Sequence, residues 1–430
     1  MSPEWMQGAA SPFSKVLVAN RGEIAVRVLQ AAREAGLSSV AVYSQSDSSS
    51  LHVETADESV LLEGGGLDET YLNGSAIIDA ARSTGADAIH PGYGFLSERA
   101  DFASAVEAAG MRWIGPSAHA IETMGDKISA RSLMIESGVP VIPGEQTPVE
   151  EGADHLGALA SAAAKVGYPL LIKASAGGGG KGMRSVSAPK NLRSEFEAAA
   201  REASSAFGDG TVYIERLLKR ARHVEIQVLC DTHGGAIHLN ERDCSLQRRY
   251  QKVIEEAPSP AVSPGMREAM GHAAVTAARS VGYVGAGTVE FLLASNGEFF
   301  FLEMNTRIQV EHPVTEMTTG IDLVQKQFEV AAGLPLGISQ DEVTQNGHSI
   351  EARVYAEDPS RGFLPSVGEL AVWKPPSGPG IRVDSGVREG DSVTIEFDPM
   401  LAKLIVHAPD RGSAIRRLDS ALSSFVVLGV

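Results

Sequence analysis

The chain has 430 residues, a formal net charge of −17 at pH 7 and a sequence pI of about 5.1. This length suits two or three lobes with clefts between them. The acidic balance argues against nucleic acids and anionic membranes as partners, because both favour clustered Lys and Arg. The two cysteines, Cys230 and Cys244, indicate no disulfide framework, and no apolar run approaches the roughly 18 residues of a membrane span. We therefore expect a cytoplasmic protein.

The two ends of the chain differ from the rest. Residues 1–14 contain Pro, Ser and Gly without an apolar core, which predicts a disordered leader. Residues 421–430 are apolar and lack a polar tail, so we expect the sequence to stop inside a folded lobe.

Strands and helices alternate up to about residue 123. The segments 15–19, 40–43 and 86–90 have strand patterns, and 24–35 and 75–84 have helical ones. This order predicts an α/β lobe with a doubly wound sheet. Its first turn lacks the G-x-G-x-x-G fingerprint, which disfavours a nicotinamide cofactor.

A stiff connector at Gly138–Pro143 leads into a smaller unit. There we expect helices at 153–166 and 189–206 and strands at 168–173 and 211–215.

The unit also contains a glycine-rich loop at Ala176–Gly182, with four consecutive glycines at Gly177, Gly178, Gly179 and Gly180. Without side chains in the way, its backbone amides can turn toward an anion, so we interpret the loop as a phosphate cradle that could close as a lid. The alternative is a flexible surface linker. The loop is not a Walker A motif, because Lys181 is followed by Gly rather than Ser or Thr.

A strand pattern at Arg222–Leu229 is followed by a basic stretch at Glu241–Lys252. Such a stretch is usually a solvated face. Because this one also holds acids and amides, we favour an anion-binding site.

Two apolar runs, Thr288–Leu293 and Glu298–Glu303, flank an Asn-Gly pair and predict a β-hairpin. A two-residue turn at Asn296-Gly297 would pair 292 with 301 and set Glu290 opposite Glu303. Opposed carboxylates destabilise a sheet unless a positive charge lies between them. Oxygen ligands without nearby Cys or His favour Mg²⁺ or Mn²⁺, and Mg²⁺ suggests a phosphorylated substrate.

Polar residues continue at every second position beyond this hairpin. The series, Glu303, Asn305, Arg307, Gln309 and Glu311, predicts one extended strand with these side chains on a single face, about 6.6 Å apart. The face is either a metal and anion site or the wet side of an edge strand.

Taken together, these segments resemble biotin carboxylase, the ATP-grasp subunit or domain of biotin-dependent carboxylases. The matching stretches are Val18–Ala25, His90–Glu98, Met124–Lys127, Ile172–Ser175 with the glycine loop, Arg222–Val228, Glu241–Glu256 and Glu303–Glu316. They cover nearly the whole chain from Lys15 onward. Other ATP-grasp ligases share the glycine loop and metal carboxylates but not the Arg-Ile-Gln-Val-Glu-His order.

The resemblance implies an α/β (α+β) ATP-grasp fold in three parts. These are an N-terminal doubly wound domain at 15–127, an ATP-grasp domain at 128–340 with a small glycine-loop lid at 142–217, and a truncated β-rich C-terminal domain at 341–430.

The resemblance also implies roles for matching residues. For the nucleotide, Lys127 and Lys173 would hold the ATP phosphates, and Gly177–Gly180 would form the lid. Glu215 and the Leu218 backbone would contact adenine, His223 would contact the ribose, and Gln247 would also lie at the nucleotide. Glu290, Glu303 and Asn305 would bind Mg²⁺. For chemistry, Lys252, Arg307, Gln309 and the Val310 backbone would hold bicarbonate, Glu311 would be the base, and Arg353 would meet biotin.

Biotin carboxylases use ATP to activate bicarbonate and then carboxylate biotin on a carrier protein. The resemblance therefore implies a biotin carboxyl carrier, a carboxyltransferase and a homodimeric state, with a bacterial acyl-CoA carboxylase α subunit favoured over pyruvate carboxylase as parent. The sequence has no Met-Lys dipeptide, so the usual biotin-acceptor motif is absent. Two residues depart from the family pattern, Tyr250 in place of a frequent His and Ala176 in place of a glycine. A carbamoyl-phosphate-forming ligase and a non-catalytic nucleotide-binding module remain as alternatives.

Overall fold

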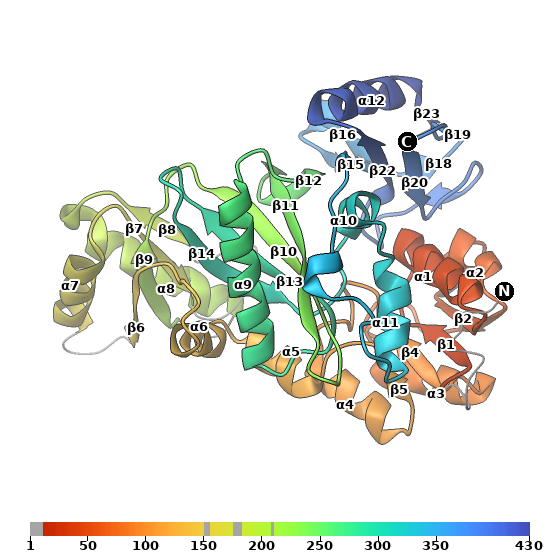
Figure 1. Cartoon of the computed structure of the whole chain (residues 1–430), viewed down its shortest axis with the longest axis horizontal. Coiled ribbons are helices and arrows are strands. Elements are labelled where there is room, and N and C mark those ends of the chain that lie inside the picture. Colours follow the sequence, from red (N-terminus) through yellow and green to blue (C-terminus); the bar gives the residue numbers. More distant parts are fainter. Residues whose placement is uncertain (1–11, 150–154, 175–182, 208–209) are drawn as a thin grey trace.

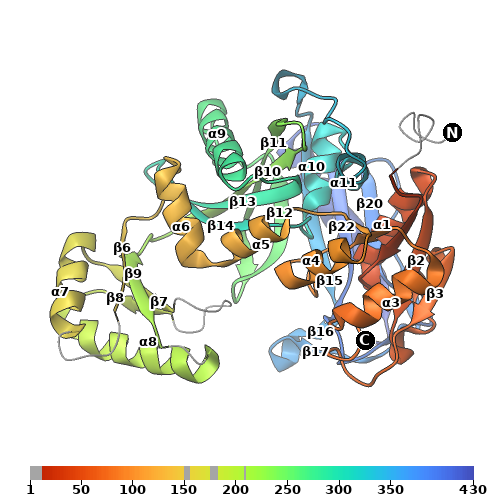
Figure 2. The same ribbon diagram turned by 90° about the horizontal axis from the view of Figure 1, so that it is seen from below.

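The computed structural model describes residues 12–149, 155–174, 183–207 and 210–430. Figures 1 and 2 show an elongated molecule, with a small lobe around α7 and α8 at one end and a parallel sheet at the other. The predicted glycine loop at 176–182 lies outside the described residues.

The N-terminal part is a five-stranded parallel sheet in the order β3-β2-β1-β4-β5, as predicted for a doubly wound lobe. Its strands are β1 (Lys15–Val18), β2 (Ser38–Tyr43), β3 (Glu58–Leu61), β4 (Ala88–His90) and β5 (Arg112–Trp113). The connecting helices are α1 (Gly22–Glu34), α2 (Leu51–Thr55), α3 (Gly74–Thr84), α4 (Ala100–Ala108) and α5 (Ala118–Gly125). Apolar residues on both sheet faces are buried, as parallel strands covered by helices require.

The end of the predicted leader belongs to this lobe. Phe13 is 1% exposed and lies in the same core as Val16, and the Ser14 N–H donates to the Asp87 carboxylate at 2.9 Å. The prediction that disorder extends to residue 14 is therefore wrong for Phe13 and Ser14; residues 1–11 lie outside the described part.

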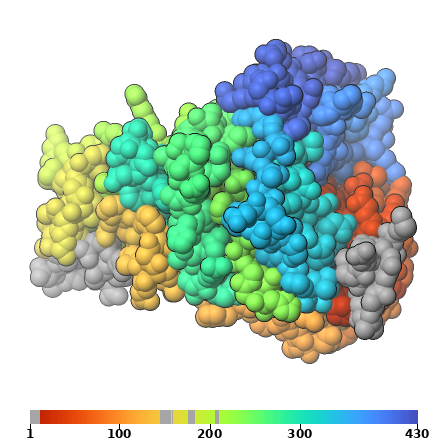
Figure 3. All heavy atoms as spheres, in the orientation of Figure 1, coloured from red at the N-terminus to blue at the C-terminus, as the bar shows by residue number. Residues whose placement is uncertain are grey.

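Helix α6 (Lys127–Glu136) leads into the small lobe, which contains a four-stranded sheet in the order β6-β9-β7-β8. Its strands are β6 (Gly144–Val149), β7 (Leu170–Ala174), β8 (Arg184–Val186) and β9 (Val212–Arg216), and its helices are α7 (His155–Val166) and α8 (Leu192–Phe207). Strands β6 and β8 were not predicted, because one contains Pro and lacks alternation and the other has three residues. Figure 3 shows this yellow-green lobe projecting from the body.

The rest of the chain is organised around an eight-stranded sheet in the order β14-β13-β10-β11-β12-β15-β22-β20. Its strands are β10 (Arg222–Cys230), β11 (Ala236–Arg248), β12 (Gln251–Ala257), β13 (Gly285–Leu293), β14 (Phe299–Asn305), β15 (His348–Tyr355), β20 (Ile381–Ser385) and β22 (Met400–Ala408). All neighbouring pairs are antiparallel. The sheet is continuous across residue 340, where the sequence suggested a domain boundary.

Helices cover this sheet, and short strands complete its C-terminal end. Helix α9 (Pro264–Ser280) packs on β10 and β11, α10 (His312–Thr319) on β11 and β15, α11 (Leu323–Ala331) on β13, and α12 (Arg411–Ser424) on β15 and β22 (Figure 1). The shorter pairs are β16 (Glu357–Asp358) with β17 (Leu364–Pro365), β18 (Gly368–Glu369) with β21 (Ser392–Val393), and β19 (Val372–Lys374) with β23 (Val426–Leu428). Both cysteines are buried and free, as predicted.

The predicted hairpin exists, but its register differs. Leu292 pairs with Phe300 rather than with Phe301, and the Gly297 N–H donates to the Ala294 carbonyl at 3.0 Å, so the turn is longer than two residues. A β-bulge then inserts Leu302 and restores the predicted pairing of Glu290 with Glu303. The prediction of opposed carboxylates is confirmed, and the reasoning from a two-residue turn is wrong.

The single strand predicted from Glu303 to Glu311 is also wrong. Strand β14 ends at Asn305, and residues 306–311 form a loop that leads into α10. The polar side chains gather because the loop folds back over the sheet and not because they share one strand face. Across the described residues, no helix is long and apolar enough to cross a membrane.

Candidate active site

A cavity of about 540 Å³ lies between the small lobe and the large sheet. Most of the predicted site residues line it, namely Lys173, Glu215, Leu218, His223, Gln247, Lys252, Glu290, Glu303, Asn305, Arg307, Gln309, Val310, Glu311 and Arg353. Lys127 begins α6 outside this lining, although its charge acts on Glu303. Residues as far apart in the sequence as Lys173 and Arg353, 180 positions, therefore meet in one cavity.

Three glutamates lie side by side in the sheet; Glu290 and Glu303 line the cavity, and Glu225 is fully buried beside them. In the sheet Glu225 of β10 is opposite Glu290 of β13, and Glu290 is opposite Glu303 of β14. Such a row is unfavourable without cations between its members.

Lys252 of β12 supplies one of these cations. Its Nζ lies 2.6 Å from Glu225 Oε2, 2.8 Å from Glu290 Oε1 and 2.7 Å from Glu311 Oε1. Burial alone would lower the pKa of Lys252, but the three carboxylates outweigh it and raise the pKa well above its ordinary value. Lys252 is thus a permanent positive charge that joins the glutamate row to the loop.

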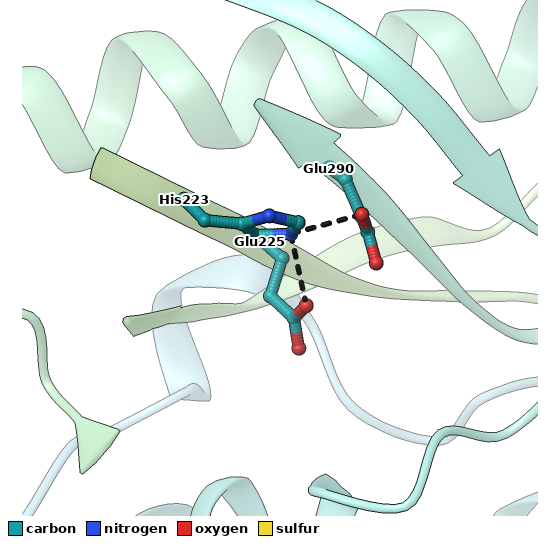
Figure 4. Close-up of side chains that lie close together, drawn as sticks. All are labelled: His223, Glu225 and Glu290. Carbon is teal, nitrogen blue, oxygen red and sulfur yellow. Dashed lines mark ion pairs between the residues drawn. The ribbon is translucent and has the colours of Figure 1, made fainter. Parts of the chain in front are cut away.

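His223 contributes a second contact at the row. Figure 4 shows its imidazole directed at Glu290, with Nε2 at 2.9 Å from Glu290 Oε2 and 3.9 Å from Glu225. Burial opposes protonation, but Glu290 raises the pKa of His223. Gln247 Nε2 lies 3.3 Å from His223 Nδ1, so the residue predicted at the ribose and the neighbouring nucleotide residue are in contact.

Glu303 has a different environment from its neighbours in the row. Across the described residues, no hydrogen bond or ion pair joins its carboxylate to another side chain. Its side chain is open to solvent in the cavity, but partial desolvation by the surrounding walls and the charge of Glu290 raise its pKa. Glu290, by contrast, accepts from Asn305 Nδ2 at 2.9 Å and has a depressed pKa, since Lys252 and His223 outweigh its burial.

This donor set fits a hard divalent cation. Two facing carboxylates and the Asn305 amide are the oxygen groups that Mg²⁺ and Mn²⁺ prefer, and the unneutralised Glu303 provides a site for positive charge.

The loop 306–311 places three predicted anion ligands over the row. Arg307 Nε donates to Glu98 at 2.9 Å, and Arg307 Nη2 donates to Asn305 Oδ1 at 3.0 Å. Gln309 is 3% exposed, and its Nε2 donates to Glu290 Oε1 at 2.9 Å. Val310 lines the cavity beside them.

Glu311 lies between two cations at the end of this loop. Lys252 contacts one carboxylate oxygen, and Arg353 Nη2 of β15 donates to the other at 3.1 Å. Burial alone would raise the pKa of Glu311, but Lys252 and Arg353 hold it well below its ordinary range. Arg353 Nε also donates to Glu255 at 2.8 Å.

On the small-lobe side, Lys173 of β7 and Glu215 of β9 form an ion pair of 2.5 Å. Leu218 follows β9 and lines the same wall. These residues face the sheet residues across the cavity, so a ligand that filled it would contact both lobes.

Several residues at or around the site were not singled out in the sequence. Arg242 is fully buried and donates to Glu225 through Nε and to Gln309 Oε1 at 2.8 Å, so it fixes both. Glu225 could have been found, because alternation places it on the same strand face as His223. Glu255 and Glu98 lie in stretches on which the family resemblance rests, but no local sequence pattern marks either residue as part of a site.

The basic stretch 241–252 divides between two environments. Arg242 and Lys252 are in the site, whereas Arg249 and Tyr250 are exposed at the β11–β12 turn, with Tyr250 81% exposed at the cavity rim. The anion-site interpretation therefore applies only to part of the stretch.

Three family models match the chain. They are "Biotin carboxylase, N-terminal domain" at residues 12–121, "Carbamoyl-phosphate synthase L chain, ATP binding domain" at 126–339 and "Biotin carboxylase C-terminal domain" at 351–430.

Individual relatives cover almost all of the chain. Biotin carboxylase 1 of Bacillus subtilis is 50% identical over 97% of this chain and 92% of its own length. The mitochondrial methylcrotonoyl-CoA carboxylase subunit alpha of Dictyostelium discoideum is 52% identical over 97% of this chain but 60% of its own length, so this chain spans less than two thirds of that relative. Relatives of similar identity are named as propionyl-CoA carboxylase and pyruvate carboxylase subunits.

Solved structures agree. The biotin carboxylase domain dimer of Hydrogenobacter thermophilus 2-oxoglutarate carboxylase, in complex with MgADP, ADP and bicarbonate, has a TM-score of 0.91 and 46% identity over 97% of this chain and 91% of that chain.

Proposed function

The chain belongs to the biotin carboxylase family and has its ATP-grasp fold, and from that premise we propose that it carboxylates biotin with ATP and bicarbonate. The observation that carries the proposal is the position of Glu311 between Lys252 and Arg353, beside the glutamate row. A base, an anion clamp and a metal site then share one cavity.

In the first step Glu311 would take the proton of bicarbonate, and the bicarbonate oxygen would attack the γ-phosphorus of ATP. The bond to the β,γ-bridging oxygen would break, which releases ADP and forms carboxyphosphate. Lys252, Arg307, Gln309 and the Val310 N–H would hold the anion. The depressed pKa of Glu311 makes it a weak base while both cations touch it. An anion that draws Lys252 or Arg353 away would raise that pKa and so strengthen the base.

Glu290, Glu303 and Asn305 would hold the divalent cation. When bound, the cation would neutralise charge on the transferred phosphoryl group. Lys127 and Lys173 would meet the phosphates, and Gly177–Gly180 would close over them. Glu215, Leu218, His223 and Gln247 would form the nucleoside end of the site.

The second step is carboxylation of the biotin ureido nitrogen. The carboxyphosphate from the first step breaks down to CO₂ and phosphate, the phosphate accepts the ureido proton, and the nitrogen attacks CO₂. Arg353 would stabilise the negative charge that develops on the ureido oxygen. Exclusion of water by a closed lid would protect the intermediate.

A proposal for the type of carboxylase goes one step beyond membership of the biotin carboxylase family. We propose that the chain is the biotin carboxylase part of an acyl-CoA carboxylase; pyruvate carboxylase is the alternative. We expect a dimer that acts together with a carboxyltransferase and with a biotin carrier, either separate or fused. Relatives named for several acceptors have nearly equal identity to this chain. We also propose a cytoplasmic location and a division of the chain into three domains, at 15–127, 128–340 and 341–430.

The test is bicarbonate-dependent ATP hydrolysis with and without free biotin. The proposal expects ADP formation that requires bicarbonate and rises with biotin. Stimulation by ammonia instead would favour a carbamoyl-phosphate-forming ligase, and ATP binding without turnover would favour a non-catalytic module.

A further inference from the structure

The Gln309-Val310-Glu311 backbone is held from behind by two buried side chains. His312 Nδ1 lies 2.7 Å from the Gln309 carbonyl oxygen, and Lys403 Nζ donates to the Val310 carbonyl oxygen at 2.9 Å. Both His312 and Lys403 are 0% exposed. Neither lines the cavity, so neither can touch a ligand there directly.

The two contacts fix the directions of two successive peptide groups, Gln309–Val310 through His312 and Val310–Glu311 through Lys403. In a trans peptide the C=O and the following N–H point in opposite directions. Holding the Gln309 carbonyl against His312 therefore directs the Val310 N–H away from His312. Val310 itself lines the cavity, so this direction would offer the Val310 N–H to an anion there.

The histidine is in the form this role needs. A carbonyl oxygen only accepts, so Nδ1 must carry the proton. Burial, with the nearby charge of Lys403, holds the pKa of His312 well below its ordinary value, and Nε2 has no hydrogen-bond partner among the residues that the structure describes. His312 is thus a neutral donor with a single tautomer.

Lys403 is anchored by charges from two other parts of the chain. Its Nζ lies 3.1 Å from Glu23 of α1 and 3.6 Å from Asp384 of β20. Glu23 accepts from the Tyr93 hydroxyl, and Lys403 is the sheet neighbour of Arg353. A buried ion cluster therefore connects the N-terminal helix and the C-terminal strands to the loop that carries Glu311.

We propose that His312 and Lys403 are positioning residues: His312 holds the Gln309–Val310 peptide, which carries the Val310 N–H, and Lys403 holds the next peptide, Val310–Glu311, so that the Val310 N–H and Glu311 are directed toward bicarbonate. The inference rests on the proposed function, because it takes bicarbonate as the anion in this part of the cavity. A buried ion cluster can stabilise the fold, or it can set the geometry of an anion site, and the experiments below distinguish these two roles.

The first experiment uses Lys403→Met and the charge-balanced double variant Lys403→Met/Glu23→Gln, which removes the nearer carboxylate together with the ammonium group. We expect the KM for bicarbonate to rise about tenfold to a hundredfold in both, the scale of one lost charge-assisted contact, while ATP affinity changes less than twofold. The double variant should recover much of any lost thermal stability without recovering the KM. Lys374→Met, at an exposed lysine, is the control and should leave KM unchanged. Recovery of the bicarbonate KM in the double variant would overturn the inference, because it would show that only charge balance matters.

The second experiment compares His312→Asn with His312→Leu. Asn can place an N–H near the position of Nδ1, so it should retain a bicarbonate KM within about threefold of the wild type, whereas Leu should raise it about tenfold or more. Equal KM values for the two variants would contradict the role of the donor.

A binding readout separates this inference from the proposed function. In ¹⁵N-valine-labelled protein, sodium bicarbonate should shift the Val310 amide resonance of the wild type at concentrations that leave Lys403→Met unchanged. Wild-type protein without bicarbonate-dependent ATP hydrolysis would contradict the proposed function alone. An equal Val310 response in both proteins would contradict the positioning role.

Discussion

Glu311 Oε1 lies 2.7 Å from Lys252 Nζ, and the same ammonium group also contacts Glu225 and Glu290. The proposed base and one proposed metal ligand are therefore electrostatically coupled through one lysine. A change of charge at either carboxylate alters the environment of the other, which makes the site a single unit rather than separate metal and proton sites.

Removal of Lys252 should destabilise the protein strongly. Lys252→Met leaves three glutamates without their common counter-charge, and breaking a buried ion pair in this way costs on the order of 3–5 kcal/mol. Thermal or urea unfolding would measure the loss. Addition of Glu225→Gln should recover part of it, and Lys190→Met, at an exposed lysine, should change little. A Lys252→Met protein as stable as the wild type would contradict the assigned geometry.

Glu303→Gln should have opposite effects on apo stability and metal dependence. Neutralising Glu303 removes its repulsion with Glu290, so the metal-free protein should unfold at a slightly higher temperature. The Mg²⁺ concentration for half-maximal ATP hydrolysis should rise about tenfold or more, because a charged ligand is lost. Chelation of the metal should abolish turnover of the wild type. Glu298→Gln, at the exposed start of the same hairpin strand, serves as the control.

Glu255 should make stability depend on pH. Burial, only partly offset by Arg353, raises the pKa of Glu255 from 4.5 to about 7. Between these values the folded chain binds a proton that the unfolded chain releases, so this group's contribution to stability is present below about pH 4.5 and is lost as pH rises toward 7. Urea unfolding of Glu255→Gln at several pH values should therefore show a smaller fall in stability across this window. An unchanged slope would show that Glu255 ionises normally.

The sequence predicted the elements whose signals are local. Alternation and turn residues located β1, β2, β4, α1 and α3 of the parallel-sheet lobe but not β3, β5, α2, α4 or α5, and the Asn-Gly signal located the hairpin. The pairing of Glu290 with Glu303 was predicted correctly, although the bulge at Leu302 was not, since no local residue pattern marks it.

Contacts between distant segments could not be predicted in the same way. Arg242 gave no signal of complete burial, and the link from Lys403 to Val310 joins residues 93 positions apart. The alternation in 303–311 even suggested the wrong backbone, because a loop that packs polar side chains around Lys252 can share the period of a strand. Only the tertiary fold determines such contacts.

In the proposed mechanism Glu311 moves the bicarbonate proton, and the variant Glu311→Gln removes that function while leaving the rest of the site in place. Gln keeps the shape and removes the charge, so we expect ATP to bind as in the wild type while bicarbonate-dependent turnover falls about 10²-fold or more. Titration of ATP and the ADP production rate in the same preparation would measure both. Normal turnover, or loss of ATP binding, would contradict the assignment of Glu311 as the base.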